Sequence, residues 1–215
     1  MENMRIAILG PQGSGKGTQA VMIAEKYGLS HIDMGKELRK RQETDDELGR
    51  MIKEIMLRGD MLPDDVPYKI FHEQVSLNNN KFIVDGFPRS IEQLRMALQI
   101  TEFDVALYIK ISDEEAVRRI SKRKICDKCK KTYIWNDNMS PKCDCGGNII
   151  QREDDTQEAV MKRLSLYHQN TELLIREYTD KNILIEVDGE QEISKVFEDA
   201  SNAIDNIMSK DTRAV

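Results

Sequence analysis

The sequence predicts an α/β fold in which a mostly parallel sheet is flanked by helices. Short apolar runs alternate along the chain with longer stretches whose apolar residues recur at helical spacing, as in strand–helix–strand units. A glycine-rich segment, residues 10–18, lies between the first apolar run and the first helical stretch. All four cysteines fall within residues 126–145, which indicates a small insert that is stabilised separately from the sheet.

Length and charge limit the function classes. The 215 residues suffice for one well-packed domain with small insertions, and the formal net charge of −6 disfavours broad binding to nucleic acid. No apolar run approaches the length of a membrane span, and residues 1–5 lack a signal-peptide core. We therefore expect a cytoplasmic protein that binds neither nucleic acid nor membrane.

The first unit consists of a strand over residues 6–9, the glycine-rich segment and a helix over residues 19–27 that ends at Gly28. Glycines allow a sharp turn whose N–H groups point inward, and the helix N-terminus adds partial positive charge. A lysine in this context reaches the β- and γ-phosphates of a nucleoside triphosphate. We predict such a site at Gly13, Ser14, Gly15, Lys16, Gly17 and Thr18. The alternative is a glycine-rich turn without a ligand.

The next elements follow from apolar spacing up to residue 80. We expect a strand over residues 29–32, helices over residues 35–41, 46–58 and 64–77, and a turn at residues 60–63. A strand over residues 81–85 then ends in Asp85. An acidic residue at the end of a buried strand organises the water shell of Mg²⁺ in many phosphate-binding sites, although it also caps turns. With the glycine-rich loop upstream, we favour the Mg²⁺ role.

The rest of the chain continues the alternation. We expect helices over residues 90–98, 112–123, 156–178 and 193–207, strands over residues 104–111 and 182–187, and a frayed tail over residues 209–215. Arg119 and Arg123 are four residues apart, so we expect them on one helix face.

The cysteines form two pairs around a strand-like stretch at residues 131–135. Cys126 and Cys129 have the usual two-residue gap of a zinc ribbon, whereas Cys143 and Cys145 are separated by one residue. Four thiolates would close a tetrahedral shell, which makes a structural Zn²⁺ site. A metal-free insert and a redox dithiol are the alternatives. An insert this small has almost no core, which favours the metal.

Arginines gather around two interruptions of the pattern, near residues 33–62 and 123–155. They are Arg39, Arg89, Arg119, Arg123, Arg152 and Arg163. Phosphoryl transfer between two phosphate-bearing substrates requires many cations, because charge spreads over the moving phosphoryl oxygens. It also requires inserts that close and exclude water.

Several segments, in order and over nearly the whole chain, resemble the adenylate kinase family. They are the loop from Gly10 to Thr18, Asp85-Gly86-Phe87-Pro88-Arg89 with Gln93, Gln151-Arg152-Glu153-Asp154-Asp155, and Lys162-Arg163-Leu164 with Tyr167-His168. The cysteine insert is similar to the zinc-bearing lid of many bacterial members. The resemblance implies a core of residues 1–32, 63–122 and 156–215. It also implies an insert that binds the nucleoside monophosphate (NMP) at residues 33–62 and a lid at residues 123–155.

The resemblance also implies a monomer that transfers a phosphoryl group reversibly from ATP to AMP, with Mg²⁺, to give two ADP. It assigns catalysis to Lys16, Arg89, Arg123, Arg152 and Arg163. ATP would bind residues 13–18 together with Arg119, Arg123, Thr132 and Tyr133. The monophosphate would bind Met34, Arg39, Asp60, Met61, Leu62, Gly86, Arg89, Gln93, Arg152 and Arg163. Thr18 and Asp85 would organise the Mg²⁺ water shell, and Cys126, Cys129, Cys143 and Cys145 would hold Zn²⁺.

The chain departs from the family pattern before the helix that bears Arg39. The family usually has Ser-Thr-Gly-Asp there, whereas this chain has Asp33-Met34-Gly35-Lys36. Met34 can pack on a base but cannot replace the threonine hydrogen bond, so the acceptor base could be different or broader. A phosphate-loop ATPase and a zinc-ribbon regulatory protein are further alternatives. Neither needs Arg39, Arg89 and Gln93 together.

Overall fold

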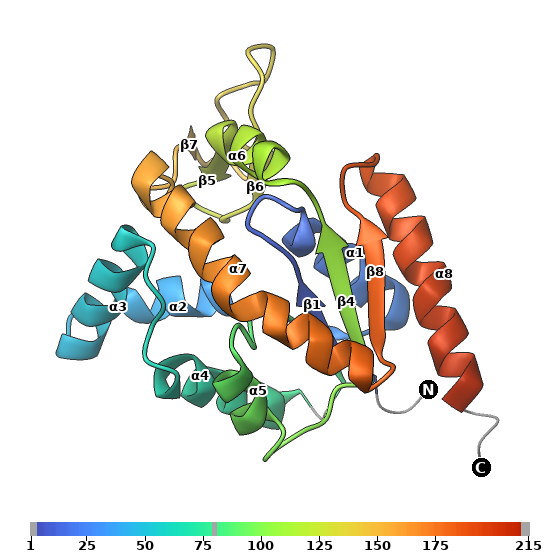
Figure 1. The fold of residues 1–215 in the computed structure, drawn as a ribbon. Coiled ribbons are helices and arrows are strands. Elements are labelled where there is room, and N and C mark those ends of the chain that lie inside the picture. The colour runs from blue at the N-terminus through green and yellow to red at the C-terminus, as the bar shows by residue number, and fades with distance from the viewer. Residues whose placement is uncertain (1–3, 79–80, 212–215) are drawn as a thin grey trace.

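The computed structural model describes residues 4–78 and 81–211 (Figure 1). Five strands form one parallel sheet in the order β2-β3-β1-β4-β8. The strands are β1 (Arg5–Leu9), β2 (Ser30–Asp33), β3 (Phe82–Asp85), β4 (Val105–Lys110) and β8 (Leu184–Asp188). The predicted α/β class is therefore confirmed.

Helices cover both faces of this sheet (Figure 1). One face packs on α1 (Lys16–Tyr27) and α8 (Ile193–Asp211). The opposite face packs on α4 (Asp65–Leu77), α5 (Ile91–Ala97) and α7 (Gln157–Asp180). Side chains of β1 alternate between the two cores, with Ile6 and Ile8 on one face and Ala7 and Leu9 on the other. A strand buried on both faces requires a continuous apolar run, as this sequence has.

Two smaller units project from the core. Helices α2 (Met34–Gln42) and α3 (Glu47–Arg58) share a cluster with α4 that contains Leu38, Ile52 and Val66. The lid follows α6 (Asp113–Ser121) and is an antiparallel sheet in the order β6-β5-β7. Its strands are β5 (Arg123–Cys126), β6 (Thr132–Ile134) and β7 (Ile149–Ile150). The buried lid cluster contains only Cys126, Cys143 and Ile149 among the described residues.

The structure corrects three sequence-based expectations. Helix α6 ends at Ser121, so Arg123 does not share a helix face with Arg119; it begins β5, where it pairs with Ile134 of β6. Strand pairing in the lid outcompetes helix propagation there. Helix α8 extends to Asp211, beyond the expected start of a frayed tail at Ser209. The rest of that tail, residues 212–215, lies outside the described residues, as do residues 1–3 of the segment expected to lack a signal-peptide core.

The third correction concerns the start of the first helix. Helix α1 begins at Lys16, three residues before the predicted boundary, because Gly15 adopts a left-handed conformation (φ 89°) and serves as its N-cap. The consequence is that Lys16, Gly17 and Thr18 belong to the first helical turn rather than to the preceding loop.

Candidate active site

The glycine-rich segment connects β1 to α1 at the carboxyl edge of the sheet, where ligands bind in open α/β folds. No side chain caps the N-terminus of α1, and its first turn has no acidic residue, so its N–H groups are free to bind an anion. The Ser14 hydroxyl is buried and has no hydrogen-bond partner in the described part of the chain. An orphaned buried hydroxyl beside free amides fits a phosphate ligand.

Lys16 folds back over this loop, and its Nζ donates to the Pro11 carbonyl at 2.8 Å. Desolvation is the main cause that lowers the pKa of Lys16 to about 8; Arg89 and Arg123 contribute to this lowering, while Asp85 opposes it. Bound phosphate oxygens would offset the desolvation of the Lys16 ammonium group.

Asp85 ends β3 and lies directly beside the start of α1. A Cβ placed on Gly17 would be 3.4 Å from Asp85 Oδ2, so a larger residue at position 17 would crowd the carboxylate. Burial raises the pKa of Asp85, Lys16 counteracts this, and the neighbouring Asp33 adds to it. Within residues 4–78 and 81–211 the Asp85 carboxylate makes no hydrogen bond or ion pair. A free carboxylate beside a glycine-rich loop of this kind can bind the water molecules that surround Mg²⁺, so Asp85 fits that role.

Two guanidinium groups of the predicted site have no carboxylate partner in the described structure, those of Arg39 and Arg89. The Arg39 group lies over Gly35, where a Cβ would be 3.2 Å from both terminal nitrogens. Arg89 Nε donates to the Gly86 carbonyl at 2.8 Å. Desolvation lowers the pKa of Arg89, and it likewise lowers that of Arg39 to about 10. Because an arginine guanidinium stays charged in proteins, both groups are available to an anion.

Three other arginines are ion-paired to two adjacent aspartates at the lid–α7 junction. Arg123 is bidentate on Asp155, and Arg152 is bidentate on Asp154. Arg163 Nη2 donates to Asp154 at 2.8 Å. Burial alone would raise the pKa of Asp154, but Arg152 and Arg163 hold it well below its usual range. Asp154 thus remains ionised, and the two aspartates keep the three guanidinium groups together through their ion pairs.

Gln93 is buried and held at both ends of its amide. Its Oε1 accepts from the Arg89 backbone N–H at 2.8 Å, and its Nε2 donates to Asp64 at 2.8 Å. A glutamine amide has two N–H donors and two acceptor lone pairs, so one of each remains. The amide orientation is therefore fixed before any ligand binds.

Other predicted residues lie in less direct positions. Met34 has 0% exposure and packs in the core, so its side chain contributes no accessible surface to a base in this conformation. Arg119 is bound to Glu115 and to the Gly189 carbonyl. Thr132 is exposed on β6, and the Tyr133 hydroxyl donates to Cys143 Sγ at 3.0 Å. Their roles at the nucleotide stay predictions.

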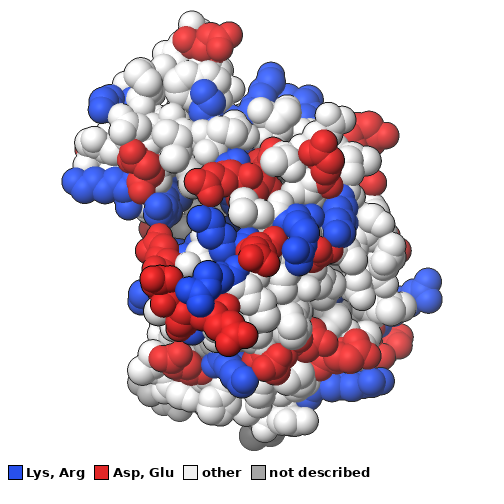
Figure 2. Space-filling model, turned by 90° about the vertical axis from the view of Figure 1, so that its left-hand side faces the viewer, with Lys and Arg blue, Asp and Glu red and all other residues white. Residues whose placement is uncertain are grey.

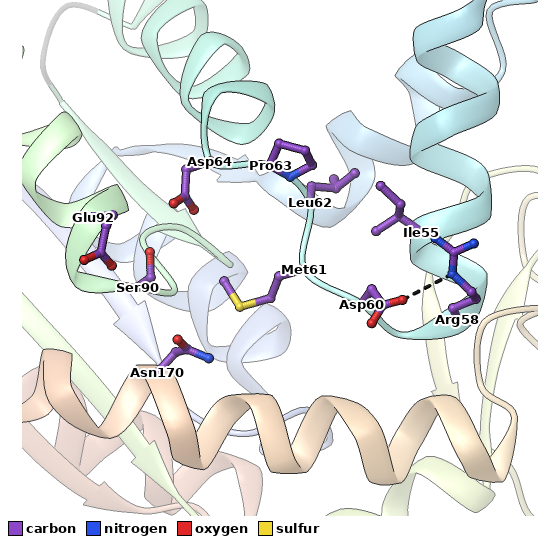
Figure 3. Close-up of a pocket in the computed structure, with 10 residues that line it drawn as sticks. All are labelled: Ile55, Arg58, Asp60, Met61, Leu62, Pro63, Asp64, Ser90, Glu92 and Asn170. Atoms are coloured by element: carbon purple, nitrogen blue, oxygen red, sulfur yellow. Dashed lines mark hydrogen bonds and ion pairs between the residues drawn. The ribbon is translucent and has the colours of Figure 1, made fainter.

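Asp60, Met61 and Leu62 line an open pocket of about 530 Å³ between the end of α3, the start of α5 and α7 (Figure 3). The close-up shows the Met61 thioether pointing into it, with Asn170 of α7 opposite. None of Lys16, Arg39 and Arg89 lines this pocket. It therefore lies beside the predicted base-binding loop and away from the cations that would bind phosphate.

The face that contains α2 and α3 presents Lys and Arg side chains interleaved with Asp and Glu below the lid (Figure 2). It is not a continuous basic surface of the kind that binds nucleic acid. None of the helices in the described ranges is both long and apolar enough to cross a membrane.

The four cysteines converge in the lid. The sulfur atoms of Cys126, Cys129, Cys143 and Cys145 all lie within 4.8 Å of one another. Such a set of four thiols fits a tetrahedral zinc site, and the one-residue gap in the second pair does not prevent convergence.

Sequence reasoning did not identify Gln12 and Asp33 as site residues. Asp33 lies beside Asp85 in the β2–β3 register and could have been inferred from its place at a strand end. Gln12 contacts α7, which is 148 residues away, and no sequence signal indicates that contact.

Comparison with known proteins agrees with this geometry. The family model described as adenylate kinase matches residues 8–183. The chain is 39% identical to an adenylate kinase of Acetivibrio thermocellus, covering 95% of this chain and 99% of the relative. It is 39% identical to one of Thermococcus onnurineus (98% of each chain). It is 40% identical to one of Methanothrix thermoacetophila (94% of this chain, 98% of the relative). The chain therefore belongs to the adenylate kinase family.

Proposed function

We propose that the protein transfers a phosphoryl group reversibly from ATP to AMP and forms two ADP. The observation that supports this most is the pair of guanidinium groups of Arg39 and Arg89, which lack a carboxylate partner in the described structure. They provide a second anion site beyond the phosphate-binding loop. An ATPase uses water as the acceptor and has no need of such a site.

The assigned roles follow from charge and position. Lys16 and the N–H groups of α1 hold the ATP phosphates, while Arg39 and Arg89 hold the monophosphate. Arg123, Arg152 and Arg163 stabilise the transferring phosphoryl group from the lid side. No general base is needed, because a phosphate oxygen is already ionised. Catalysis then consists of positioning and charge stabilisation.

Two metals fit the protein, one at the nucleotide site and one in the lid. Bound Mg²⁺ supplies charge neutralisation at the β- and γ-oxygens, and we assign its water shell to Asp85 and Thr18. We assign structural Zn²⁺ to the four lid cysteines, whose sulfur atoms converge. We further propose that the protein is a cytoplasmic monomer in which residues 33–62 and 123–155 are separate units that close over the core.

We assign the acceptor base to the loop at residues 60–62 and to Gln93. The remaining N–H and lone pair of its fixed amide can pair with the complementary donor and acceptor of adenine. Since the Met34 side chain has no hydrogen-bond donor, we assign discrimination mainly to Gln93. A broader acceptor range is the second candidate, because Met34 removes one polar contact of the usual family pattern.

An ADP-formation assay tests the proposal. Mg-ATP is supplied separately with AMP, CMP, UMP, GMP or no acceptor. Fast turnover with AMP alone is the expected result. Turnover with several monophosphates would retain the mechanism but replace the acceptor assignment, and acceptor-independent ADP release would replace it with ATP hydrolysis. Lack of turnover under all conditions would contradict an enzymatic role.

A further inference from the structure

Gln12, in the phosphate-binding loop, makes two hydrogen bonds to α7. Its Nε2 donates to the Val160 carbonyl at 2.8 Å. Its Oε1 accepts a longer bond, 3.4 Å, from Nη1 of Arg163. A single amide thus contacts both the backbone of α7 and an arginine that we assign to the transferring phosphoryl group.

The next residue in the loop packs on a different helix. A Cβ on Gly13 would be 2.9 Å from the Ala116 carbonyl of α6, and Gly13 adopts φ 84°. The tip of the loop is therefore enclosed by α6 on one side and α7 on the other. Helix α6 leads into the lid and α7 follows it, so the loop tip contacts both helices that flank the lid.

Arg163 extends the connection in two directions. Its Nη2 donates to the Met56 carbonyl at 2.9 Å, near the end of α3, and to Asp154 at 2.8 Å, at the lid junction. Arg163 therefore contacts the NMP insert and the lid junction, while Gln12 contacts Arg163. In the described residues the Gln12 side chain makes no hydrogen bond to either insert, so Arg163 is the intermediary.

We propose that Gln12 is a positioning residue that couples the phosphate-binding loop to Arg163. The inference rests on the proposed kinase function for its kinetic consequence. Gln12 contributes no charge to the reacting groups. It holds the Arg163 guanidinium at a defined distance from the loop, so that the ATP phosphates and the arginine that acts on them are aligned by one side chain.

Gln12→Met tests this, because methionine has similar length and makes neither hydrogen bond. We expect kcat to fall about tenfold, while KM for ATP changes less than about threefold, since Lys16 and the α1 amides are intact. The matched control is Gln169→Met. Gln169 is an exposed glutamine on α7 whose amide donates to Ser165 Oγ at 3.0 Å, and its replacement should leave kcat unchanged.

A double-mutant cycle separates positioning from general structural damage. In an Arg163→Lys background the Nη1 bond is already lost, so Gln12→Met should reduce kcat less than about twofold further. An equal tenfold reduction in both backgrounds, or an unchanged kcat in Gln12→Met alone, would overturn the proposal. As long as the wild-type enzyme is active, neither of these two results contradicts the kinase function.

A readout without turnover keeps the proposal testable if the wild-type chain is inactive. The Arg163 Nε–H NMR resonance, assigned by its loss in Arg163→Lys, should shift or broaden in Gln12→Met. It should remain unchanged in Gln169→Met. An identical resonance in wild type and Gln12→Met would overturn the coupling, whatever the assay of ADP formation shows.

Discussion

At the residue scale, the cations of the site fall into two classes. Lys16, Arg39 and Arg89 have no carboxylate partner in the described structure, whereas Arg123, Arg152 and Arg163 are bound to Asp154 and Asp155. Unpaired cations repel one another and need a ligand anion, while paired ones are already oriented. The first class is therefore suited to ground-state phosphate binding and the second to alignment when the lid closes.

The first prediction concerns Arg89. Arg89→Ala removes the charge-assisted contact that we propose to the acceptor phosphate, and it should lower kcat/KM by at least about 100-fold. Steady-state assays measure this, and thermal unfolding should show an intact fold. Arg176→Ala, at an exposed arginine on α7, is the matched control and should retain normal turnover. Near-normal kcat/KM in Arg89→Ala would contradict the assigned role.

The second prediction follows from the pKa of Lys16, which desolvation lowers to about 8 in the free protein. ATP phosphates should raise this pKa toward its ordinary value of 10.5. The complex then binds more protons than the free enzyme, so ATP affinity should fall as pH rises above 8. Calorimetry in buffers of different ionisation enthalpy should detect proton uptake near pH 8. A Kd that is constant from about pH 7 to about pH 9.5 would be inconsistent with this.

At the element scale, α7 connects most of the site. It begins after the lid, capped by Thr156, and it bears Lys162, which pairs with Asp60 of the base-binding loop. Arg163 follows on the same helix, and Thr171 donates to the Arg89 carbonyl at 3.4 Å. A 24-residue helix is rigid over this length, so it can keep contacts to the core, lid and NMP insert in a fixed relation.

His168 joins α7 to α6, and the third prediction concerns its titration. Its Nδ1 lies 2.7 Å from Glu172 and its Nε2 lies 3.0 Å from Asp113, and these contacts raise the His168 pKa above 6.5. The stabilisation is complete below pH 6.5 and is lost as pH rises through the raised folded-state pKa. The side chain is 43% exposed, so screening limits the effect to about 0.5 kcal/mol.

Urea unfolding of His168→Gln provides the measurement. The variant should be less stable than wild type at about pH 6 and equal to it at about pH 9. A destabilisation of His168→Gln that is larger at pH 9 than at pH 6 would reverse the sign and refute the ion pairs.

The lid supports the fourth prediction. Its buried cluster is very small, so a metal that binds four thiolates should supply much of its stability. Elemental analysis should find one zinc per chain. Chelation should lower the melting temperature, while kcat measured before unfolding should change little. Cys129→Ser should reproduce the loss. If chelation leaves melting unchanged and no metal is detected, the zinc assignment is wrong.

At the scale of the whole molecule, the site lies where three units meet: the carboxyl edge of the sheet, the α2–α3 insert and the lid. Charged groups of both signs cover the face between the inserts (Figure 2). Substrate anions that bind the unpaired cations would reduce repulsion there and favour closure. Small-angle scattering should therefore show a smaller radius of gyration with AMP and a non-hydrolysable ATP analogue together than with either alone. An unchanged radius would contradict closure by the inserts.

The sequence by itself determined the parallel α/β class, nearly every element of the core and the place of the glycine-rich loop between the first strand and the first helix. These features depend on local signals: apolar periodicity, capping residues such as Ser90 and Thr156, and the spacing of glycines around Lys16. The boundary at Arg123 shifted because tertiary contacts compete with local preference there: this residue pairs into the lid sheet instead of continuing α6.

Only the tertiary structure decided which charges are paired. The contacts of Arg123 with Asp155, of Lys162 with Asp60 and of Gln12 with Val160 span 32, 102 and 148 positions. No local pattern specifies them. The tertiary structure also decided that Met34 is buried beneath the site and that the unevenly spaced cysteines converge on one point. The physical reason is that pairing depends on distances between side chains of different elements, which are set by how the two layers of helices pack on the sheet.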